Sequence, residues 1–250
     1  MSSLFYKRLG FGPPIILLHG FCETHQIWDG FAESLTADFS VVSFDLPGFG
    51  ESQLISPLSI ESVALRIIQE LEALKMNRCV IVGHSLGGYV ALAMQQARPE
   101  LFAGIVLFHS TVFADTEEKK SNRNKTIEFV KNYGVAPFVD TFVTNLFHQK
   151  NHPSVLEIHK MAMQTPLETL INYSEAMRDR PARDQIEGFD LLILAGRFDA
   201  IIPISVSEQM STLSDRTTLK VLPSSGHMGM LEDREKSLDS IRAFGLTRLV

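Results

Sequence analysis

Six short apolar segments constrain the fold of this 250-residue chain more than any other feature of its sequence. They occupy residues 15–18, 41–44, 79–83, 104–108, 191–196 and 218–222. Each is rich in Val, Ile and Leu, and the apolar residues follow one another rather than alternate with polar ones. Continuous runs of this length are typical of parallel β-strands that are covered on both faces. We therefore predict a largely parallel sheet.

Helical patterns lie between these segments. Apolar residues recur every three or four positions over 63–74, over 86–97 and over 238–244, which indicates helices with one buried face. Strands that alternate with helices predict an α/β fold with a doubly wound, mostly parallel sheet. The length and the 45% hydrophobic content of the chain favour a single domain over residues 1–250.

The alternation lapses over about 115–187, where helical patterns replace strand-like runs. Phe138, Phe142 and Leu146, for example, fall on one helical face. We interpret this segment as a helical cap inserted between two strands, with Thr165 as the N-cap of one of its helices. A charged stretch near its end is expected to be solvated, and its arginines are Arg178, Arg180 and Arg183.

Composition and charge argue against several classes of function. The net charge of −6 is spread without basic blocks, so no nucleic-acid partner is expected. The apolar run at 15–18 is too short for a signal sequence or a membrane span, and we expect no membrane partner. The two cysteines, Cys22 and Cys79, imply no disulfide framework. These features predict a cytoplasmic protein.

A candidate nucleophile lies in the stretch Gly83-His84-Ser85-Leu86-Gly87, which has the pattern G-x-S-x-G. A predicted strand precedes it and a predicted helix follows, which is the context that this motif requires. A serine on so tight a strand-to-helix turn has strained backbone torsions, and side chains two residues away would collide with their neighbours. Ser85 is therefore predicted to be a nucleophile at the N-terminus of a helix.

A serine nucleophile needs a base, and the base needs an orienting acid. Asp199 follows the predicted strand at 191–196, and His227 follows the next strand. Both then lie at the same sheet edge as Ser85, where open α/β sheets bind ligands. Asp199 is predicted to accept a hydrogen bond from His227, which would take the proton of Ser85. The other acids that we considered are Asp115, Asp190, Glu232 and Asp233.

Negative charge that develops on the substrate oxygen needs N–H donors. The backbone N–H of Leu86 is one candidate, because it follows the nucleophile directly. The N–H of Phe21 is the second, since it lies in the sequence His19-Gly20-Phe21 after the first apolar segment. These two groups are predicted to form an oxyanion hole.

Five motifs together resemble the α/β-hydrolase superfamily: HGF at 19–21, DLPGFGES at 45–52, GHSLGG at 83–88, GRFD at 196–199 and GH at 226–227. The resemblance extends from about residue 6 to residue 246 and is to compact serine esterases with a helical cap. It implies a structural role for the loop at 45–52, so Asp45 is not expected to be the acid. The short N-terminus departs from the family pattern and reduces the first hairpin of the sheet.

The resemblance and the residues predict a serine hydrolase that cleaves a small, mainly apolar carboxylic ester through an acyl-enzyme. No cofactor and no metal are expected, and the partner is a small-molecule substrate whose choice depends on cap residues such as Phe142 and Met161. A lactonase, a carbon–carbon bond hydrolase and a cofactor-free perhydrolase remain alternatives on the same triad. A non-enzymatic ligand receptor is a further alternative, because a fold does not fix a function.

Overall fold

The structure is a computed structural model that describes residues 4–249. Its described residues form a seven-stranded sheet with the order β1-β3-β2-β4-β5-β6-β7. The strands are β1 (Tyr6–Leu9), β2 (Pro14–Leu18), β3 (Ser40–Phe44), β4 (Cys79–His84), β5 (Phe102–Phe108), β6 (Leu191–Gly196) and β7 (Thr217–Leu222). All neighbouring strands are parallel except β1, which pairs antiparallel with β3. The predicted doubly wound, mostly parallel sheet is confirmed.

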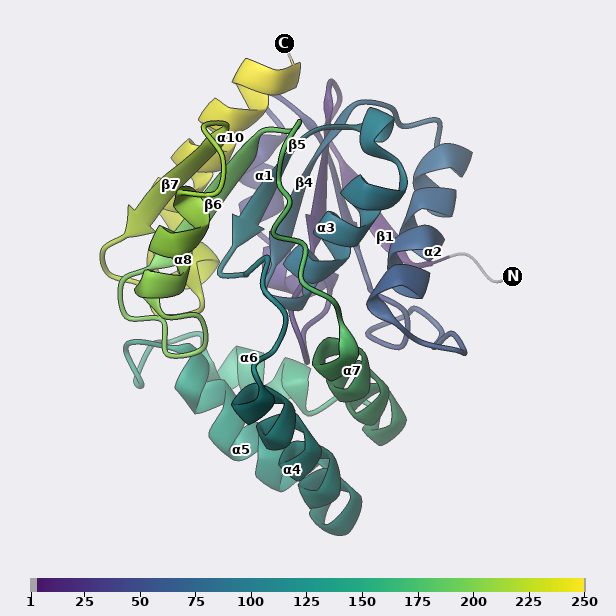
Figure 1. The fold of residues 1–250 in the computed structure, drawn as a ribbon, viewed down its shortest axis with the longest axis vertical. Coiled ribbons are helices and arrows are strands. Elements are labelled where there is room, and N and C mark those ends of the chain that lie inside the picture. Colours follow the sequence, from purple (N-terminus) through teal and green to yellow (C-terminus); the bar gives the residue numbers. More distant parts are fainter. Residues whose placement is uncertain (1–3, 250) are drawn as a thin grey trace.

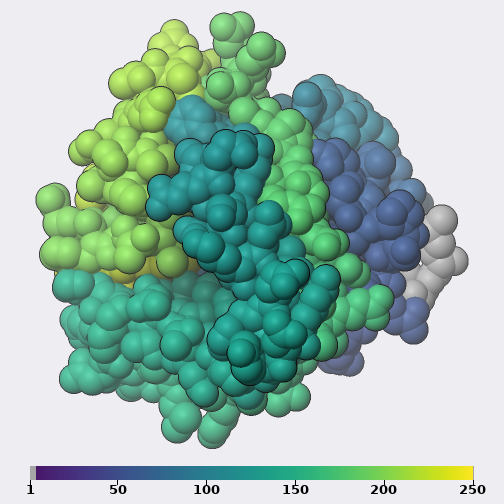
Figure 2. Space-filling view, turned by 60° about the horizontal axis from the view of Figure 1, so that its bottom comes forward, coloured from purple at the N-terminus to yellow at the C-terminus, as the bar shows by residue number. Residues whose placement is uncertain are grey.

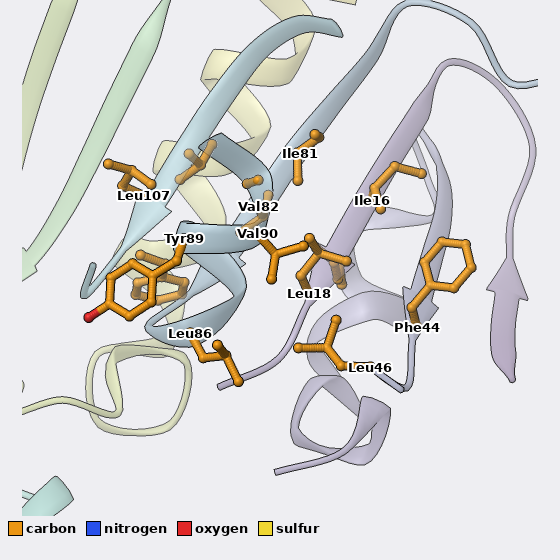
Figure 3. Packing of buried hydrophobic residues seen from close by; sticks show 14 of the residues in the cluster. Ile16, Leu18, Phe44, Leu46, Ile81, Val82, Leu86, Tyr89, Val90 and Leu107 are labelled. Atoms are coloured by element: carbon orange, nitrogen blue, oxygen red, sulfur yellow. The ribbon is translucent and has the colours of Figure 1, made fainter. Parts of the chain in front are cut away.

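Helices cover both faces of this sheet (Figure 1). On one face lie α2 (Ile60–Ala73), α3 (Leu86–Ala97) and α8 (Ile204–Ser211), and on the other lie α1 (Phe31–Leu35) and α10 (Arg234–Leu249). Shorter helical turns are η1 (His25–Trp28), η2 (Pro99–Leu101) and α9 (Gly229–Glu232). The five interior strands β2–β6 are almost wholly buried, as continuous apolar runs require. In Figure 3, Val90 of α3 lies among core side chains that include Leu18 of β2 and Val82 of β4.

The two edge strands differ from the central ones. In β7 the side chains of Thr218 and Lys220 are exposed, while Leu222 is buried. The prediction that both faces of the strand are covered is therefore wrong for β7. This strand lies at the edge of the sheet, and one of its faces meets solvent. At the opposite edge, β1 is a four-residue strand that pairs with β3 alone.

Four helices lie between β5 and β6, in the segment interpreted as a cap. They are α4 (Glu117–Tyr133), α5 (Val135–Leu146), α6 (Val155–Ala162) and α7 (Leu167–Asp179). Figure 1 shows them together at one end of the molecule, and Figure 2 shows how their teal and green side chains cover that end. Pro166 rather than Thr165 is the N-cap of α7, and no side chain caps this helix, so the predicted cap residue is wrong by one position.

No helix within residues 4–249 combines the length and the apolar character that a membrane span requires.

Candidate active site

The loops that follow β2, β4, β5, β6 and β7 meet at the carboxyl edge of the sheet. Because these strands are parallel, residues far apart in sequence come together there. Phe21, Ser85, His109, Asp199 and His227 each lie within five residues of a strand end. The edge therefore brings together all the residues that the sequence analysis selected for catalysis, together with one that it did not select, His109.

Ser85 has the backbone geometry of a nucleophile elbow. It connects β4 to α3 with φ 48° and ψ −110°, a strained combination for a residue other than glycine. A Cβ at Gly83 would lie 2.4 Å from the carbonyl oxygen of Gly87, and a Cβ at Gly87 would lie 2.4 Å from that of Leu18. Both positions thus require glycine for the steric reason that the motif suggested.

Asp199 and His227 form a buried hydrogen-bonded pair. His227 Nδ1–H donates to Asp199 Oδ2 at 2.7 Å, and the side chains are 2% and 1% exposed. The other carboxylate oxygen, Oδ1, accepts from the backbone N–H groups of Ile201 (2.8 Å) and Ile202 (2.9 Å). Burial acts to raise the pKa of Asp199, but the neighbouring imidazoles of His227 and His109 outweigh it and hold this pKa well below its usual range. The carboxylate is therefore fixed in both position and charge.

His109 is a second imidazole on the same carboxylate. Its Nδ1 lies 3.2 Å from Asp199 Oδ2, and its Nε2 accepts the backbone N–H of Gly229 at 3.0 Å. Burial lowers the pKa of His109 to about 4, against the opposite effect of Asp199, so the ring is neutral. Its Nδ1 lies between Asp199 Oδ2 and the backbone N–H of Gly196, 3.2 Å from each. The sequence analysis did not select this residue. The signal that could have identified it is its place directly after β5.

Ser85 and His227 open on a common cavity of about 70 Å³ beneath the cap. Its apolar lining consists of Phe21, Phe142, Leu146, Met177 and Ile201. Ser85 makes no hydrogen bond to His227 among the described residues. In hydrolases without bound substrate, the hydrogen bond between nucleophile and base is often long or poorly aligned.

Two backbone N–H groups near Ser85 have no acceptor within residues 4–249. They belong to Phe21, in the turn after β2, and to Leu86, the first residue of α3. Leu86 is completely buried, and the unpaired N–H groups at a helix N-terminus attract negative charge. The two groups that were predicted to form an oxyanion hole are thus available to donate.

A buried ion pair lies behind this turn. His84 Nδ1–H donates to Glu23 Oε2 at 2.9 Å, and His84 Nε2–H donates to the carbonyl oxygen of His227 at 2.9 Å. Glu23 Oε2 also accepts the N–H of Gly20 at 2.7 Å. Burial favours neutral His84, but Glu23 reverses this effect and raises the pKa of His84. Because both ring nitrogens donate, His84 is an imidazolium. Sequence analysis did not identify this pair.

The other acids that we considered do not contact His227. Asp115 pairs with Arg123 and Arg180, Asp190 pairs with Arg216 and Arg248, Glu232 accepts from Gly226 and His148, and Asp233 accepts from Ser224. Asp45 bonds His25 and the N–H of Glu51, within its own turn. These acids have partners of their own, and Asp199 is the acid that lies against His227.

Three further side chains, those of His19, Cys22 and His148, are accounted for by structural contacts or by burial. His19 donates through Nδ1 to its neighbour Gly20 and accepts the N–H of Leu46 at Nε2, so it ties two loops together. Burial raises the pKa of the Cys22 thiol, which keeps it protonated and unreactive. His148 stacks on Phe198 at 3.8 Å between ring centroids.

One prediction about the cap is wrong. Arg180 was expected to be solvated, yet its side chain is 2% exposed, with Nη1 2.9 Å from Asp115 Oδ1. Its guanidinium lies 3.8 Å above the ring of Tyr89 on α3. The planar guanidinium can stack on a ring while it pairs with a carboxylate, so burial costs it less than the charge pattern alone suggests.

His109, Asp199 and His227 are also close enough to be tested as a metal site. Their ligand atoms lie within 4.8 Å of one another. However, His227 Nδ1 carries the proton of its hydrogen bond to Asp199, and both ring nitrogens of His109 already face backbone N–H groups, whereas a metal ligand must present a free lone pair. The hydrogen-bond pattern of these residues fits a histidine base oriented by a carboxylate better than a metal centre.

A sequence model of the family described as alpha/beta hydrolase fold matches residues 13–234. The chain belongs to this family. Among solved structures, this α/β-hydrolase is similar to a thermophilic esterase from Thermogutta terrifontis with malate bound, with a TM-score of 0.93 and 29% identity over 99% of this chain and 94% of that one.

Curated relatives of this α/β-hydrolase have related activities. A pimeloyl-[acyl-carrier protein] methyl ester esterase of Vibrio atlanticus is 25% identical, over 97% of this chain and 98% of that protein. A 3-oxoadipate enol-lactonase of Acinetobacter baylyi is 23% identical, over 93% of this chain and 88% of that protein. Both relatives are named for reactions that open an ester linkage.

Proposed function

We propose that this α/β-hydrolase is a serine esterase that cleaves a small carboxylic ester through an acyl-enzyme. One observation carries the proposal. The buried Asp199–His227 pair opens on the same cavity as Ser85, which is held forward on a strained elbow. Hydrolysis by a serine requires a nucleophile, a base and an acid in this relation.

In the proposed mechanism, His227 Nε2 takes the proton of Ser85 as Oγ attacks the ester carbonyl carbon. Asp199 holds the other ring nitrogen and stabilises the imidazolium that forms. The N–H groups of Phe21 and Leu86 donate to the oxyanion of the tetrahedral intermediate. The intermediate collapses, the alcohol leaves with the proton from His227, and the acyl group remains on Ser85. A water molecule, deprotonated by His227, then releases the acid and restores Ser85.

The similarity to a methyl ester esterase and to a thermophilic esterase supports the ester as the scissile group. The similarity to an enol-lactonase supports a lactone as a second candidate, since a lactone is a cyclic ester that the same residues would open. The carbon–carbon bond hydrolase, the perhydrolase and the receptor stay alternatives from the sequence.

Two measurements test the proposal together. The first is hydrolysis of p-nitrophenyl esters of increasing acyl length by the unmodified protein, Ser85→Ala and Asp199→Asn. The second is labelling by a fluorophosphonate probe, read by mass spectrometry. We expect labelling at Ser85 alone and a loss of turnover on the order of 10³-fold or more in both variants.

Matched variants serve as controls for these measurements. Ser240→Ala on α10 and Asp233→Asn at the end of α9 remove the same groups from residues outside the cavity, and both are expected to keep their turnover. Labelling that persists in Ser85→Ala, or equal losses in Asp199→Asn and Asp233→Asn, would contradict the assignment.

A further inference from the structure

The cavity beside Ser85 has a cationic wall, and we propose that it binds the carboxylate of an anionic substrate. Arg123 of α4 is the residue that makes this contact. The preferred substrate is then an ester or lactone that carries a carboxylate a few bonds from its scissile carbonyl, and not the mainly apolar ester that the sequence predicted. This inference rests on the proposed function, because it names the substrate class of the same site.

Arg123 lies where two cavities meet. It lines the small cavity that holds Ser85 and His227, and it also lines an outer cavity of about 300 Å³. Its side chain is 24% exposed. Nε donates to Asp115 Oδ2, and within residues 4–249 this is the one hydrogen bond of the guanidinium. The Nη1 and Nη2 groups are thus left to donate to a ligand.

The partner of Arg123 does not neutralise it. Asp115 is shared with Arg180, whose Nη1 lies 2.9 Å from Asp115 Oδ1. Both terminal nitrogens of Arg180 already have acceptors, since Nη1 donates to the carbonyl oxygen of Met177 and Nη2 to that of Phe113. One carboxylate therefore serves two guanidinium groups. An excess positive charge remains at the cavity wall, on the arginine that is partly exposed.

The other charged groups of the two cavities do not offset this excess. Glu23, the one other acid among their described lining residues, is paired with the His84 imidazolium. Lys119, one turn before Arg123 on the same helix, lines the outer cavity and adds a second cation. The electrostatics of the cavity entrance therefore favour an anion.

Between Arg123 and the reacting atoms the walls are apolar. Phe21, Phe142 and Ile201 line both cavities, so a short methylene chain would be buried there. The hydroxyl of Tyr89, which also lines both cavities, makes no hydrogen bond to another described residue. It is a second donor for a carboxylate. Arginine binds carboxylates with two parallel hydrogen bonds, which fits the two free nitrogens of Arg123.

The test compares two esters of the same shape. One is monomethyl glutarate, and the other is methyl 5-methylhexanoate, in which an isopropyl group replaces the carboxylate. Proton release in a pH-stat gives kcat/KM for each ester with the unmodified protein, Arg123→Gln and Arg178→Gln. Arg178 is a matched control, because it is 26% exposed on cap helix α7 and lines neither cavity.

We expect the unmodified protein to prefer the anionic ester, and added NaCl to reduce that preference by screening. Arg123→Gln should lower the ratio of the two kcat/KM values on the order of 10- to 100-fold, and Arg178→Gln should leave the ratio unchanged. An unmodified protein without the preference, or an unchanged ratio in Arg123→Gln, overturns the anionic subsite. Failure to hydrolyse either ester, with Ser85 unlabelled by fluorophosphonate, would instead overturn the proposed esterase function.

Discussion

At the scale of single residues, the buried pair of Glu23 and His84 has the clearest energetic consequence. Both side chains are at most 2% exposed, and each is charged because the other is present. Removing one member of such a pair leaves an uncompensated charge away from water, which costs on the order of 3–5 kcal/mol. Glu23 also holds the turn that carries Phe21, through the N–H of Gly20.

We therefore expect Glu23→Gln to lower the free energy of unfolding by about 3–5 kcal/mol, measured by urea denaturation at pH 7. Glu33→Gln is the control. Glu33 pairs with Lys7 at the surface, where its side chain is 47% exposed, and such pairs contribute less than about 1 kcal/mol. Similar losses in the two variants would show that the Glu23–His84 contact is not a buried ion pair.

The residues that sequence reasoning missed are those whose roles depend on contacts between distant loops. A Cβ at Gly83 would meet Gly87, four residues away, whereas a Cβ at Gly87 would meet Leu18 on another strand. The five-residue pattern predicts both glycines because it is specific to the strand-to-helix turn. Glu23 and His84 are 61 positions apart, and His109 and Gly229 are 120 apart. His84 lies inside the serine motif and His109 directly follows a predicted strand, but nothing local in the sequence identifies the partner of either ring. Their partners are determined only when the parallel strands bring their loops to one edge.

At the scale of elements, helices α4, α5 and α7 contribute side chains to the lining of the cavity that holds Ser85. The sequence analysis predicted that substrate choice depends on cap residues such as Phe142 of α5 and Met161 of α6. The structure places Phe142 in both cavities, stacked on Phe138 at 5.1 Å between ring centroids. Met161 is partly buried against the core and lines neither cavity. Periodicity indicates which face of a helix is buried, but not whether a cavity or another helix lies against it.

The two residues therefore form a matched pair for a test of substrate choice. Phe142→Ala should enlarge the cavity and shift the ranking of p-nitrophenyl esters toward longer acyl chains, by on the order of tenfold in relative kcat/KM. Met161→Ala should leave the ranking in place. A ranking that moves equally in both variants would mean that α5 and α6 act through general loosening of the cap.

At the scale of the whole molecule, several histidines titrate differently in the folded and unfolded chain. Burial lowers the pKa of His109 to about 4, whereas an unfolded histidine titrates near about 6.5. Burial lowers the pKa of His19 as well. The pKa of His84 is raised, so it is protonated in both states below pH 6.5 and adds no slope there. Asp199, whose folded pKa is depressed, affects stability only near and below the unfolded value of about 3.9.

Between about pH 6.5 and 4, the unfolded chain binds a proton at residue 109 that the folded protein excludes. The stability that neutral His109 contributes is complete above pH 6.5 and falls by about 1.4 kcal/mol per pH unit as the pH drops through this window. From pH 6.5 to 5 the loss from this residue alone is about 2 kcal/mol.

His109→Gln has no such proton, and its amide can still donate to Asp199. We expect urea unfolding of this variant to show a shallower dependence of stability on pH, whatever its stability at pH 7. Parallel curves for the variant and the unmodified protein would mean that residue 109 is protonated in the folded state.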